Sequence, residues 1–513
     1  MKSIQASQNQ SLFADATYKP RLVMCFVILI ALILVLASPH ANGTPRYLYA
    51  DPSSYAISLY GINADFIKGV TKNPAGFLEF AKSGSATWQM MAPAAGLYRI
   101  RTLYACDDPG SQIQISISDR SVDFYLPKTD GYYDVSTRAT PRGALWPHGM
   151  GDAPMQNYNR LDLGKVVPLK AGTNTITLTV TMPSGHVSFF LRSIELLSTQ
   201  KQYLAQAEAH DAKELRVRAD WLMQAGFGLM FHWTPQTAPR FGVPVKYADA
   251  AQAFNVPAFA DMVNRTGARY VIFTANHVDP EFPAPLKDWE AVHPGWTTKR
   301  DLIGEIADAL NVRRIKLILY IHVQSAADPT WGDRHRTIIN GTQFADNAIR
   351  LITEVGNRYG TRIAGYWFDS FPDIETQYPE FPYMRFYQAS KAGNPTRIVA
   401  FTNWIYPIAT NWQDYWGGEV FVPGLPPYHL PQRTGPARGL PFHALLALNG
   451  DWIHTARDSP IGPPIFTVDE LSTFINSVNG KGAVTIGVPI YQNGTIGEEQ
   501  SRYFEQLRQR IHR

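Results

Sequence analysis

Five apolar runs in the second part of the chain are each followed by polar or aromatic side chains. In chain order these residues are His232-Trp233, Asn276-His277-Val278-Asp279, His322, Trp367-Phe368-Asp369-Ser370 and Asn403-Trp404. Histidine, asparagine and aspartate hydrogen-bond to hydroxyl groups, and tryptophan contacts an apolar face. We therefore expect one pocket for a polyhydroxylated ligand with one apolar face.

Asp369 is the strongest single candidate for chemistry. It follows the apolar stretch GYWF (365–368), where a carboxylate is costly unless it reaches a polar pocket. An aspartate at a strand end can also cap the next helix, so its position alone leaves both interpretations open.

Residues 221–513 are predicted to form a (β/α)8-like barrel. The strand-like runs are FGLMFHW (227–233), ARYVIFTA (268–275), IKLILYIH (315–322), IAGYWFDS (363–370) and RIVAFTN (397–403). Amphipathic stretches such as 256–267 and 301–313 separate them, which indicates a parallel sheet covered on both faces. A barrel places reactive groups at the C-terminal ends of its strands. A doubly wound open sheet is the alternative, although no G-x-G-x-x-G fingerprint follows any run.

Residues 44–200 are predicted to form a separate all-β sandwich, so the chain is multidomain. Short segments such as GLYRIRTLYA (96–105) and TNTITLTV (173–180) alternate apolar and polar residues between turn-rich stretches. The charged stretch 201–220 is predicted to be a linker helix. If the barrel stays soluble alone, we expect it to keep activity without residues 44–200.

Residues 1–43 are predicted to be a signal peptide or an N-terminal membrane anchor. The run LVMCFVILIALILVLAS (22–38) carries no charge, and Lys2, Lys19 and Arg21 precede it. A buried core helix is the alternative. We expect the body of the chain to lie outside the cytoplasm, whether secreted, periplasmic or membrane-anchored.

The composition limits the partners and cofactors of the protein. The net charge is +4 without a basic run in the body of the chain, which argues against nucleic acid as a partner. Of the two cysteines, Cys25 lies in the apolar segment and leaves Cys106 alone, so we expect no disulfide. We expect neither a metal nor another cofactor. A metal-dependent hydrolase built from His232, His277 and Asp279 is an alternative, but it lacks H-x-x-x-H or H-x-H spacing.

Several motifs resemble one enzyme family across about residues 205–513. In chain order they are WLMQAGFGLMFHW (221–233), TGARYVIFTANHVD (266–279), GYWFDS (365–370), FTNW (401–404) and ELSTFINSVNGKGAVTIGVPIYQNGTIGEEQ (470–500). Their order and spacing resemble the α-L-fucosidases of glycoside hydrolase family 29. The resemblance implies a retaining exo-glycosidase whose partner is a glycan or oligosaccharide. Residues 44–200 are similar to carbohydrate-binding modules of the galactose-binding-like group.

The resemblance also implies roles for individual residues. Asp369 becomes the nucleophile, and Glu419 the preferred acid/base because it stands where one subgroup has T-P-E. Retention requires these two carboxyl groups about 5 Å apart. The implied sugar-binding residues are His232, Trp233, His277, Trp367 and Asn403. Asp414 is the alternative acid/base, Glu281 and Glu375 are weaker candidates, and His443 stands where another subgroup has the acid.

Two departures from the family pattern concern the substrate. Val278 replaces the second histidine of a His-His pair, and Trp404 and Ile405 stand where the family has an Asp-Arg pair after the asparagine. The pocket therefore takes a related sugar, or other arginines replace the lost contacts; the candidates are Arg397, Arg433 and Arg438. A non-catalytic carbohydrate-binding protein on the same barrel is the alternative function. The sequence does not indicate the oligomeric state.

Overall fold

The computed structural model describes residues 48–49, 55–73, 76–106, 112–117, 120–129, 132–133, 155–156, 158–182, 189–330, 337–402, 410–419 and 440–511. The apolar run 22–38 lies outside these residues. None of the helices in the described ranges is long and apolar enough to cross a membrane.

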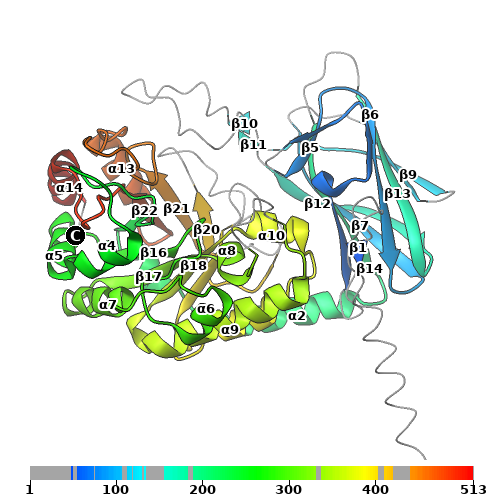
Figure 1. Cartoon of the computed structure of the whole chain (residues 1–513). Helices are drawn as coiled ribbons and strands as arrows, with labels where there is room; N and C mark the ends of the chain where they lie inside the picture. The colour runs from blue at the N-terminus through cyan, green and yellow to red at the C-terminus, as the bar shows by residue number, and fades with distance from the viewer. Residues whose placement is uncertain are drawn as a thin grey trace, which may run out of the picture. The chain divides into compact units, whose positions relative to one another are not determined.

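The N-terminal region is a sandwich of two six-stranded sheets, as predicted (Figure 1). The first sheet has the order β1-β6-β13-β8-β9, with β3 beside β6, and the second has the order β12-β7-β14-β5-β4, with β2 beside β14. The strands of the first sheet are β1 (Leu48–Tyr49), β3 (Phe66–Lys68), β6 (Gly84–Ala92), β8 (Gln112–Ile117), β9 (Arg120–Tyr125) and β13 (Gly172–Thr181). Those of the second are β2 (Ala56–Tyr60), β4 (Thr71–Asn73), β5 (Phe77–Phe80), β7 (Gly96–Cys106), β12 (Asn159–Leu169) and β14 (Phe189–Ser198). A short pair, β10 (Tyr132–Tyr133) and β11 (Met155–Gln156), stands apart from both sheets.

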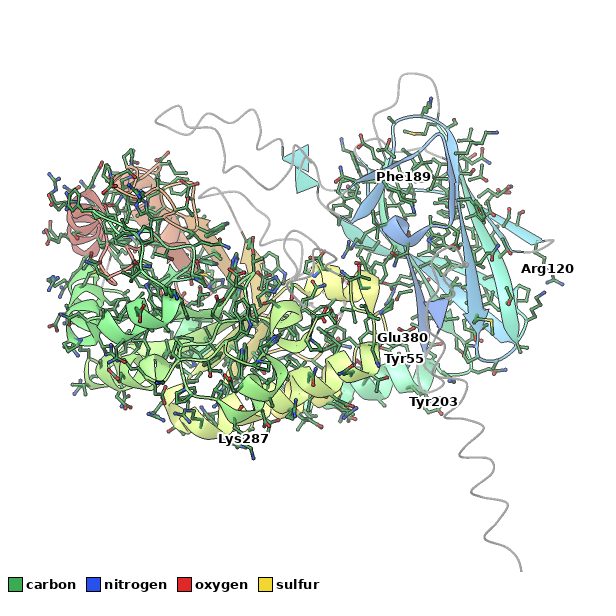
Figure 2. The ribbon with its side chains drawn as sticks, in the orientation of Figure 1. Tyr55, Arg120, Phe189, Tyr203, Lys287 and Glu380 are labelled. Carbon is green, nitrogen blue, oxygen red and sulfur yellow. The ribbon has the colours of Figure 1, made fainter. Side chains whose placement is uncertain are left out.

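The core of the sandwich follows from the alternation of side chains along each strand. Ile176, Leu178 and Val180 of β13 face inward, and the threonines between them face outward. Figure 2 shows Phe189 among the packed side chains, whereas Arg120 extends to the outside. The fold therefore agrees with the strand pattern of the sequence.

The second region is a parallel β-barrel, as predicted. Its eight strands have the order β19-β18-β17-β16-β15-β22-β21-β20. They are β15 (Phe227–Phe231), β16 (Tyr270–Asn276), β17 (Lys316–His322), β18 (Gly365–Asp369), β19 (Ile398–Phe401), β20 (Trp416–Glu419), β21 (Phe442–Ala447) and β22 (Gly482–Gly487). A parallel bridge between Thr402 and Gly417 joins the β19 and β20 ends of this order, so the barrel is nearly closed.

Helices follow most barrel strands and cover the outside of the barrel (Figure 1). They are α4 (Tyr247–Ala253), α5 (Val256–Thr266), α6 (Lys287–Val292), α7 (Leu302–Val312), α8 (Val323–Ala327), α9 (Gly341–Tyr359), α10 (Phe371–Gln377), α11 (Tyr383–Ser390), α13 (Val468–Val478) and α14 (Glu498–Arg510). Two single-turn 3-10 helices are also described: η1 (Gly61–Asn63) follows β2 in the sandwich, and η2 (Gly360–Arg362) precedes β18 in the barrel. Within the predicted linker, α2 (Gln202–Leu215) is mostly exposed, and α3 (Asp220–Met223) begins after a short extended stretch.

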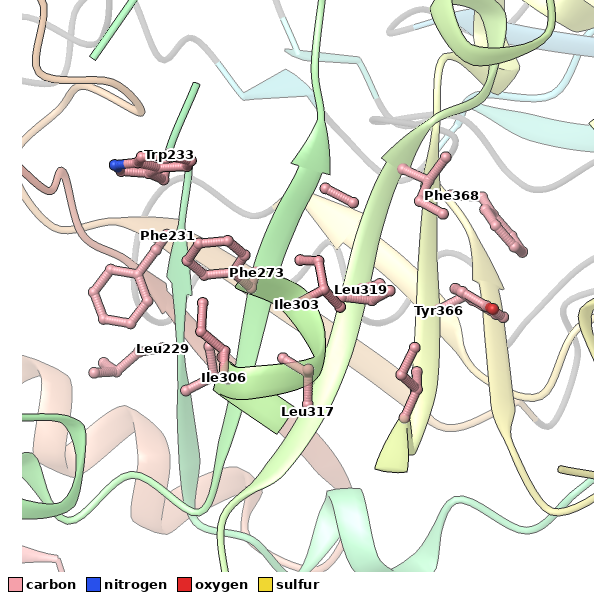
Figure 3. Close-up of a cluster of buried hydrophobic side chains, with 14 of the residues drawn as sticks. Leu229, Phe231, Trp233, Phe273, Ile303, Ile306, Leu317, Leu319, Tyr366 and Phe368 are labelled. Carbon is pink, nitrogen blue, oxygen red and sulfur yellow. The ribbon is translucent and has the colours of Figure 1, made fainter. Parts of the chain in front are cut away.

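The two faces of each barrel strand pack into different clusters. Leu229 and Phe231 of β15 face the helices and pack with Ile303 and Ile306 of α7 in the outer cluster (Figure 3). Met230, between them in sequence, points into the barrel interior. Because successive side chains on a strand point to opposite faces, this alternation decides which residues can reach the mouth of the barrel.

Candidate active site

Asp369 is the last residue of β18 and lies at the C-terminal mouth of the barrel. Its carboxylate accepts a hydrogen bond from the Tyr320 hydroxyl at Oδ2, and the amide of Ser370 donates to Oδ1 at 2.7 Å. Both donors favour the ionised carboxylate and hold it in one orientation. Asp369 therefore has the surroundings of an anionic group in a fixed position.

The backbone turns sharply directly after Asp369. Ser370 has φ of 74°, a left-handed backbone conformation that residues other than glycine rarely adopt. Its hydroxyl accepts a hydrogen bond of 2.9 Å from the amide of Gln324 and donates to the carbonyl of Asp369. Strained backbone of this kind persists where the surrounding contacts hold it, and it is common at functional sites.

Glu419 ends β20, two strands from Asp369 around the barrel. Burial raises the pKa of Glu419 to about 8, and the negative charge of Asp369 adds to the increase. Glu419 therefore holds a proton at neutral pH beside the carboxyl group of Asp369. Two carboxyl groups whose environments separate their protonation states are typical of an acid and a nucleophile in one site.

Two histidines line the same mouth from neighbouring strands. His232 follows β15, His277 follows β16, and their ring centroids are 5.3 Å apart. Burial lowers the pKa of His232 well below its usual value, so its ring is neutral, and His277 adds to this shift. Nδ1 of His232 is buried and has no hydrogen-bond partner among the residues that the structure describes. A buried nitrogen in this state is suited to a hydrogen bond with a ligand.

Two aromatic residues that sequence reasoning missed also belong to this cluster. The centroid of Tyr320 lies 5.1 Å from that of His232, and the centroid of Trp452 lies 5.6 Å from it. Tyr320 lies two residues before His322 and two after Ile318, so its side chain points to the same inner face of the barrel. This alternation along the strand could have identified Tyr320 from the sequence. Trp452 comes from the loop after β21 and had no comparable signal. A Cβ on Gly487 would lie 2.6 Å from the Trp452 ring, so the glycine makes room for it.

The two predicted tryptophans occupy different places. The prediction for Trp233 needs correction, because its side chain lies in the outer cluster rather than in the pocket wall (Figure 3). It is 1% exposed, and its Nε1 donates to the carbonyl of Gln492 at 2.9 Å. Trp367 points into the barrel interior, two residues before Asp369, with its ring 4.5 Å from that of His443. It lies beneath the mouth as a floor residue.

Asp414, the alternative acid/base, lies before β20 and therefore at the opposite end of the barrel from Asp369. Its buried carboxylate accepts hydrogen bonds from the amides of Val217 and Val399 at 2.7 and 2.8 Å. It also accepts one from the Tyr387 hydroxyl at 2.7 Å, and Lys391 pairs with it at 2.5 Å. This position corrects the alternative assignment, because the carboxylate is fully engaged in a structural network.

The weaker acid candidates also lie in distinct environments. Glu375 belongs to α10, and its Oε2 lies 3.7 Å from a nitrogen of Arg192 in the sandwich. Glu281 follows β16, and burial raises its pKa to about 7, with Asp279 contributing. His443 lies in the barrel interior and hydrogen-bonds Thr485, and burial lowers its pKa to about 3.

Of the three arginines proposed to replace the missing family arginine, the structure describes Arg397, which does not lie at the mouth of the barrel. Arg397 is buried before β19 and donates to the carbonyls of Ser390, Ala392, Gly356 and Gly360. It therefore cannot reach a ligand beside Asp369. Arg433, Arg438 and the predicted sugar ligand Asn403 lie outside the described residues.

The metal alternative has no support within the described ranges. No group of three or more histidine, cysteine, aspartate or glutamate side chains there could hold a metal ion. Asp279, one of the three proposed ligands, accepts a hydrogen bond from Gln236 at 3.1 Å.

The barrel region of the chain is similar to known proteins. A family model described as alpha-L-fucosidase matches residues 245–511. Tissue α-L-fucosidase of Bos taurus is 28% identical over 133 residues, which cover 20% of this chain and 28% of that protein. Plasma α-L-fucosidase of Homo sapiens is 24% identical over 209 residues, covering 33% of this chain and 43% of that protein. The crystal structure of Thermotoga maritima α-fucosidase has a TM-score of 0.42 at 17% identity, covering 58% of this chain and 74% of that one. The chain thus matches only 28% of the length of the tissue enzyme.

Proposed function

Because the chain belongs to the α-L-fucosidase family, we propose that it is a retaining exo-glycosidase that hydrolyses α-L-fucosides or glycosides of a related sugar. The observation that carries this proposal is a pair of carboxyl groups at the barrel mouth whose surroundings differ. Asp369 accepts two hydrogen bonds that favour its charge, and the pKa of Glu419 is raised to about 8 by burial and by Asp369. A retaining mechanism needs one carboxylate and one carboxylic acid.

The proposed reaction has two steps. In the first, an Asp369 oxygen attacks the anomeric carbon while Glu419 gives its proton to the leaving glycosidic oxygen, so the glycosidic bond breaks and a glycosyl ester forms. In the second, ionised Glu419 takes a proton from water, the water oxygen attacks the anomeric carbon, and Asp369 leaves as a carboxylate. Two inversions at the anomeric carbon restore its original configuration, and the proton taken from water returns Glu419 to its acid form while Asp369 is again a carboxylate.

The remaining residues of the cluster are proposed to bind the sugar. The neutral imidazole of His232 can accept or donate a hydrogen bond to a hydroxyl group. His277 stands beside it, and the partly exposed Trp452 ring offers an aromatic surface for the apolar face of the sugar. Tyr320 holds the nucleophile through its hydrogen bond to Asp369.

A non-catalytic carbohydrate-binding protein is the second candidate. Val278 favours it, because the family pattern has a histidine at this position and valine offers no polar contact. The electrostatic influence of Asp369 on Glu419 favours the enzyme, since a binding protein has no need of an acid beside a carboxylate.

A screen of aryl glycosides, beginning with 4-nitrophenyl α-L-fucoside, tests the proposal. We expect release of nitrophenol by the full chain and none by Asp369→Asn, with an anomerically retained product by NMR. An inverted product would contradict the mechanism. Binding of the free sugar without hydrolysis of any glycoside in the screen would favour the binding protein.

A location outside the cytoplasm is also proposed, on the strength of the apolar run 22–38. A fusion of residues 1–60 to a reporter that is active only after export tests it. An inactive reporter that accumulates inside the cell would contradict the proposal.

A further inference from the structure

A β-bulge in the sandwich directs one arginine out of its sheet. In the pairing of β14 with β7, Leu191 faces Tyr104 and Ser193 faces Leu103, so Arg192 is the extra residue between two neighbouring pairs. Bulges of this kind re-aim a side chain and are frequent next to active sites. The side chain of Arg192 is only 1% exposed, so its charge must be met by protein groups.

The guanidinium group of Arg192 joins the sandwich to the barrel. Nη1 donates to the carbonyl of Gly76 at 2.7 Å, and Nη2 donates to the carbonyl of Pro372 in α10 at 2.8 Å. Nη2 also lies 3.7 Å from Oε2 of Glu375 in the same helix. A Cβ on Gly76 would lie 2.1 Å from Nη1, so this residue must be glycine for the arginine to occupy its place.

The helix held in this way begins directly after the proposed nucleophile. Pro372 is three residues from Asp369, and Ser370 between them has φ of 74° and donates its amide to the Asp369 carboxylate. Asn63 of the sandwich makes a second contact by donating to the carbonyl of Thr376. The sandwich thus contacts α10 near both of its ends.

We propose that Arg192 is a positioning residue, which holds α10 and through Ser370 orients the carboxylate of Asp369. The sandwich then belongs to the catalytic apparatus, in contrast to the expectation that the barrel acts without residues 44–200. The helix has seven residues, and helices this short depend on packing for their position. A displacement of a reacting group by about 1 Å can cost a hundredfold in rate.

The activity part of the test rests on the proposed glycosidase function, so a second measurement is independent of it. Arg192→Gln removes the charge and the fork of donors, and Arg192→Lys keeps the charge alone. The matched control is Arg99→Gln, since Arg99 pairs with Asp162 at 3.2 Å within the sandwich. For each full-length variant, hydrogen–deuterium exchange is followed in the segment 370–377, together with kcat and KM on an aryl glycoside.

We expect Arg192→Gln to increase exchange in 370–377 at least fivefold while the barrel strands exchange as in the wild type. In that folded protein kcat should fall roughly ten- to a hundredfold with KM within about threefold. Arg192→Lys should show a smaller change of both, and Arg99→Gln none.

Wild-type exchange in 370–377 of a folded Arg192→Gln protein would overturn the proposal, whatever its activity. If Arg192→Gln does not fold, Arg192→Lys takes its place, and wild-type exchange in 370–377 of that variant would equally overturn the proposal. If the wild type hydrolyses no glycoside, the proposed function fails, and the exchange measurement still decides whether Arg192 holds α10.

Discussion

Replacing Glu419 by alanine should harm substrates according to how much their leaving group needs a proton. Glu419 has its pKa raised from 4.5 to about 8, so about 99% of it is protonated at pH 6. General acid catalysis contributes roughly a hundred- to ten-thousandfold, or about 3–5 kcal/mol of activation free energy. We expect Glu419→Ala to lose this full factor on a natural disaccharide. Loss should be far smaller in the glycosylation of an activated aryl glycoside, whose phenolate leaves without help.

The assay compares kcat/KM on the two substrates, with and without sodium azide. Azide attacks the glycosyl-enzyme without a general base, so it should restore turnover of the aryl glycoside by Glu419→Ala and produce a glycosyl azide of retained configuration. The matched control is Glu281→Ala, because burial also raises the pKa of Glu281, to about 7, and this residue also follows a barrel strand. Rescue of Glu281→Ala in place of Glu419→Ala would transfer the role. Equal losses on both substrates with no azide product would refute the reasoning.

The remaining predictions concern the same carboxyl group and its neighbours. Above pH about 8, kcat/KM should fall as Glu419 loses its proton. The pKa of Glu419 in the folded protein exceeds the unfolded value of 4.5, so the free energy of unfolding should decrease as the pH rises from 4.5 to about 8. Denaturant titrations should show that Glu419→Gln removes this decrease. Asp369→Asn should abolish turnover while circular dichroism and the melting temperature stay near wild type, and retained turnover would contradict its role as nucleophile. Tyr320→Phe should lower kcat about tenfold or more, because a hydrogen bond to a charged group contributes about 1.5–3 kcal/mol; unchanged kcat would argue against orientation of Asp369 by this hydroxyl. Asp414→Ala should lower the free energy of unfolding by about 3–5 kcal/mol, because it leaves the charge of Lys391 buried without its partner, and a melting temperature equal to wild type would contradict this.

Apolar runs and helix signals predict most of the barrel because they reflect local physics. The stretches 256–267 and 301–313 became α5 (Val256–Thr266) and α7 (Leu302–Val312), each begun by a side chain that caps the helix. The predicted helix 201–220 was too long, since α2 ends at Leu215. Where a charged stretch stops being helical depends on contacts such as that of the Val217 amide with Asp414, which a local pattern does not contain.

The strand-end positions of Asp369, His232 and His277 could be predicted from the sequence. The directions in which the neighbouring side chains point could not all be predicted. His232 and Trp233 are adjacent in sequence, yet one faces the mouth and the other the outer core, because alternate residues of a strand point to opposite sides. Asp414 and Glu419 are five residues apart, yet Asp414 lies before β20 and Glu419 ends it, so they lie at opposite ends of the barrel. The partner of Glu375 could not be predicted either, because Arg192 reaches it from a bulge far away in sequence.

The joint between β19 and β20, where the barrel closes, has a consequence for the stereochemistry of the proposed reaction. Within the described residues, β19 and β20 are joined by the single bridge between Thr402 and Gly417, and Asp369 and Glu419 stand on either side of that joint. Retaining enzymes hold their carboxyl groups about 5 Å apart, whereas inverting enzymes separate them by about 6.5–9.5 Å to admit a water molecule. Widening the joint by one or two ångströms would therefore move the pair from one geometry toward the other. The anomeric configuration of the product then reports how closely β19 and β20 approach each other.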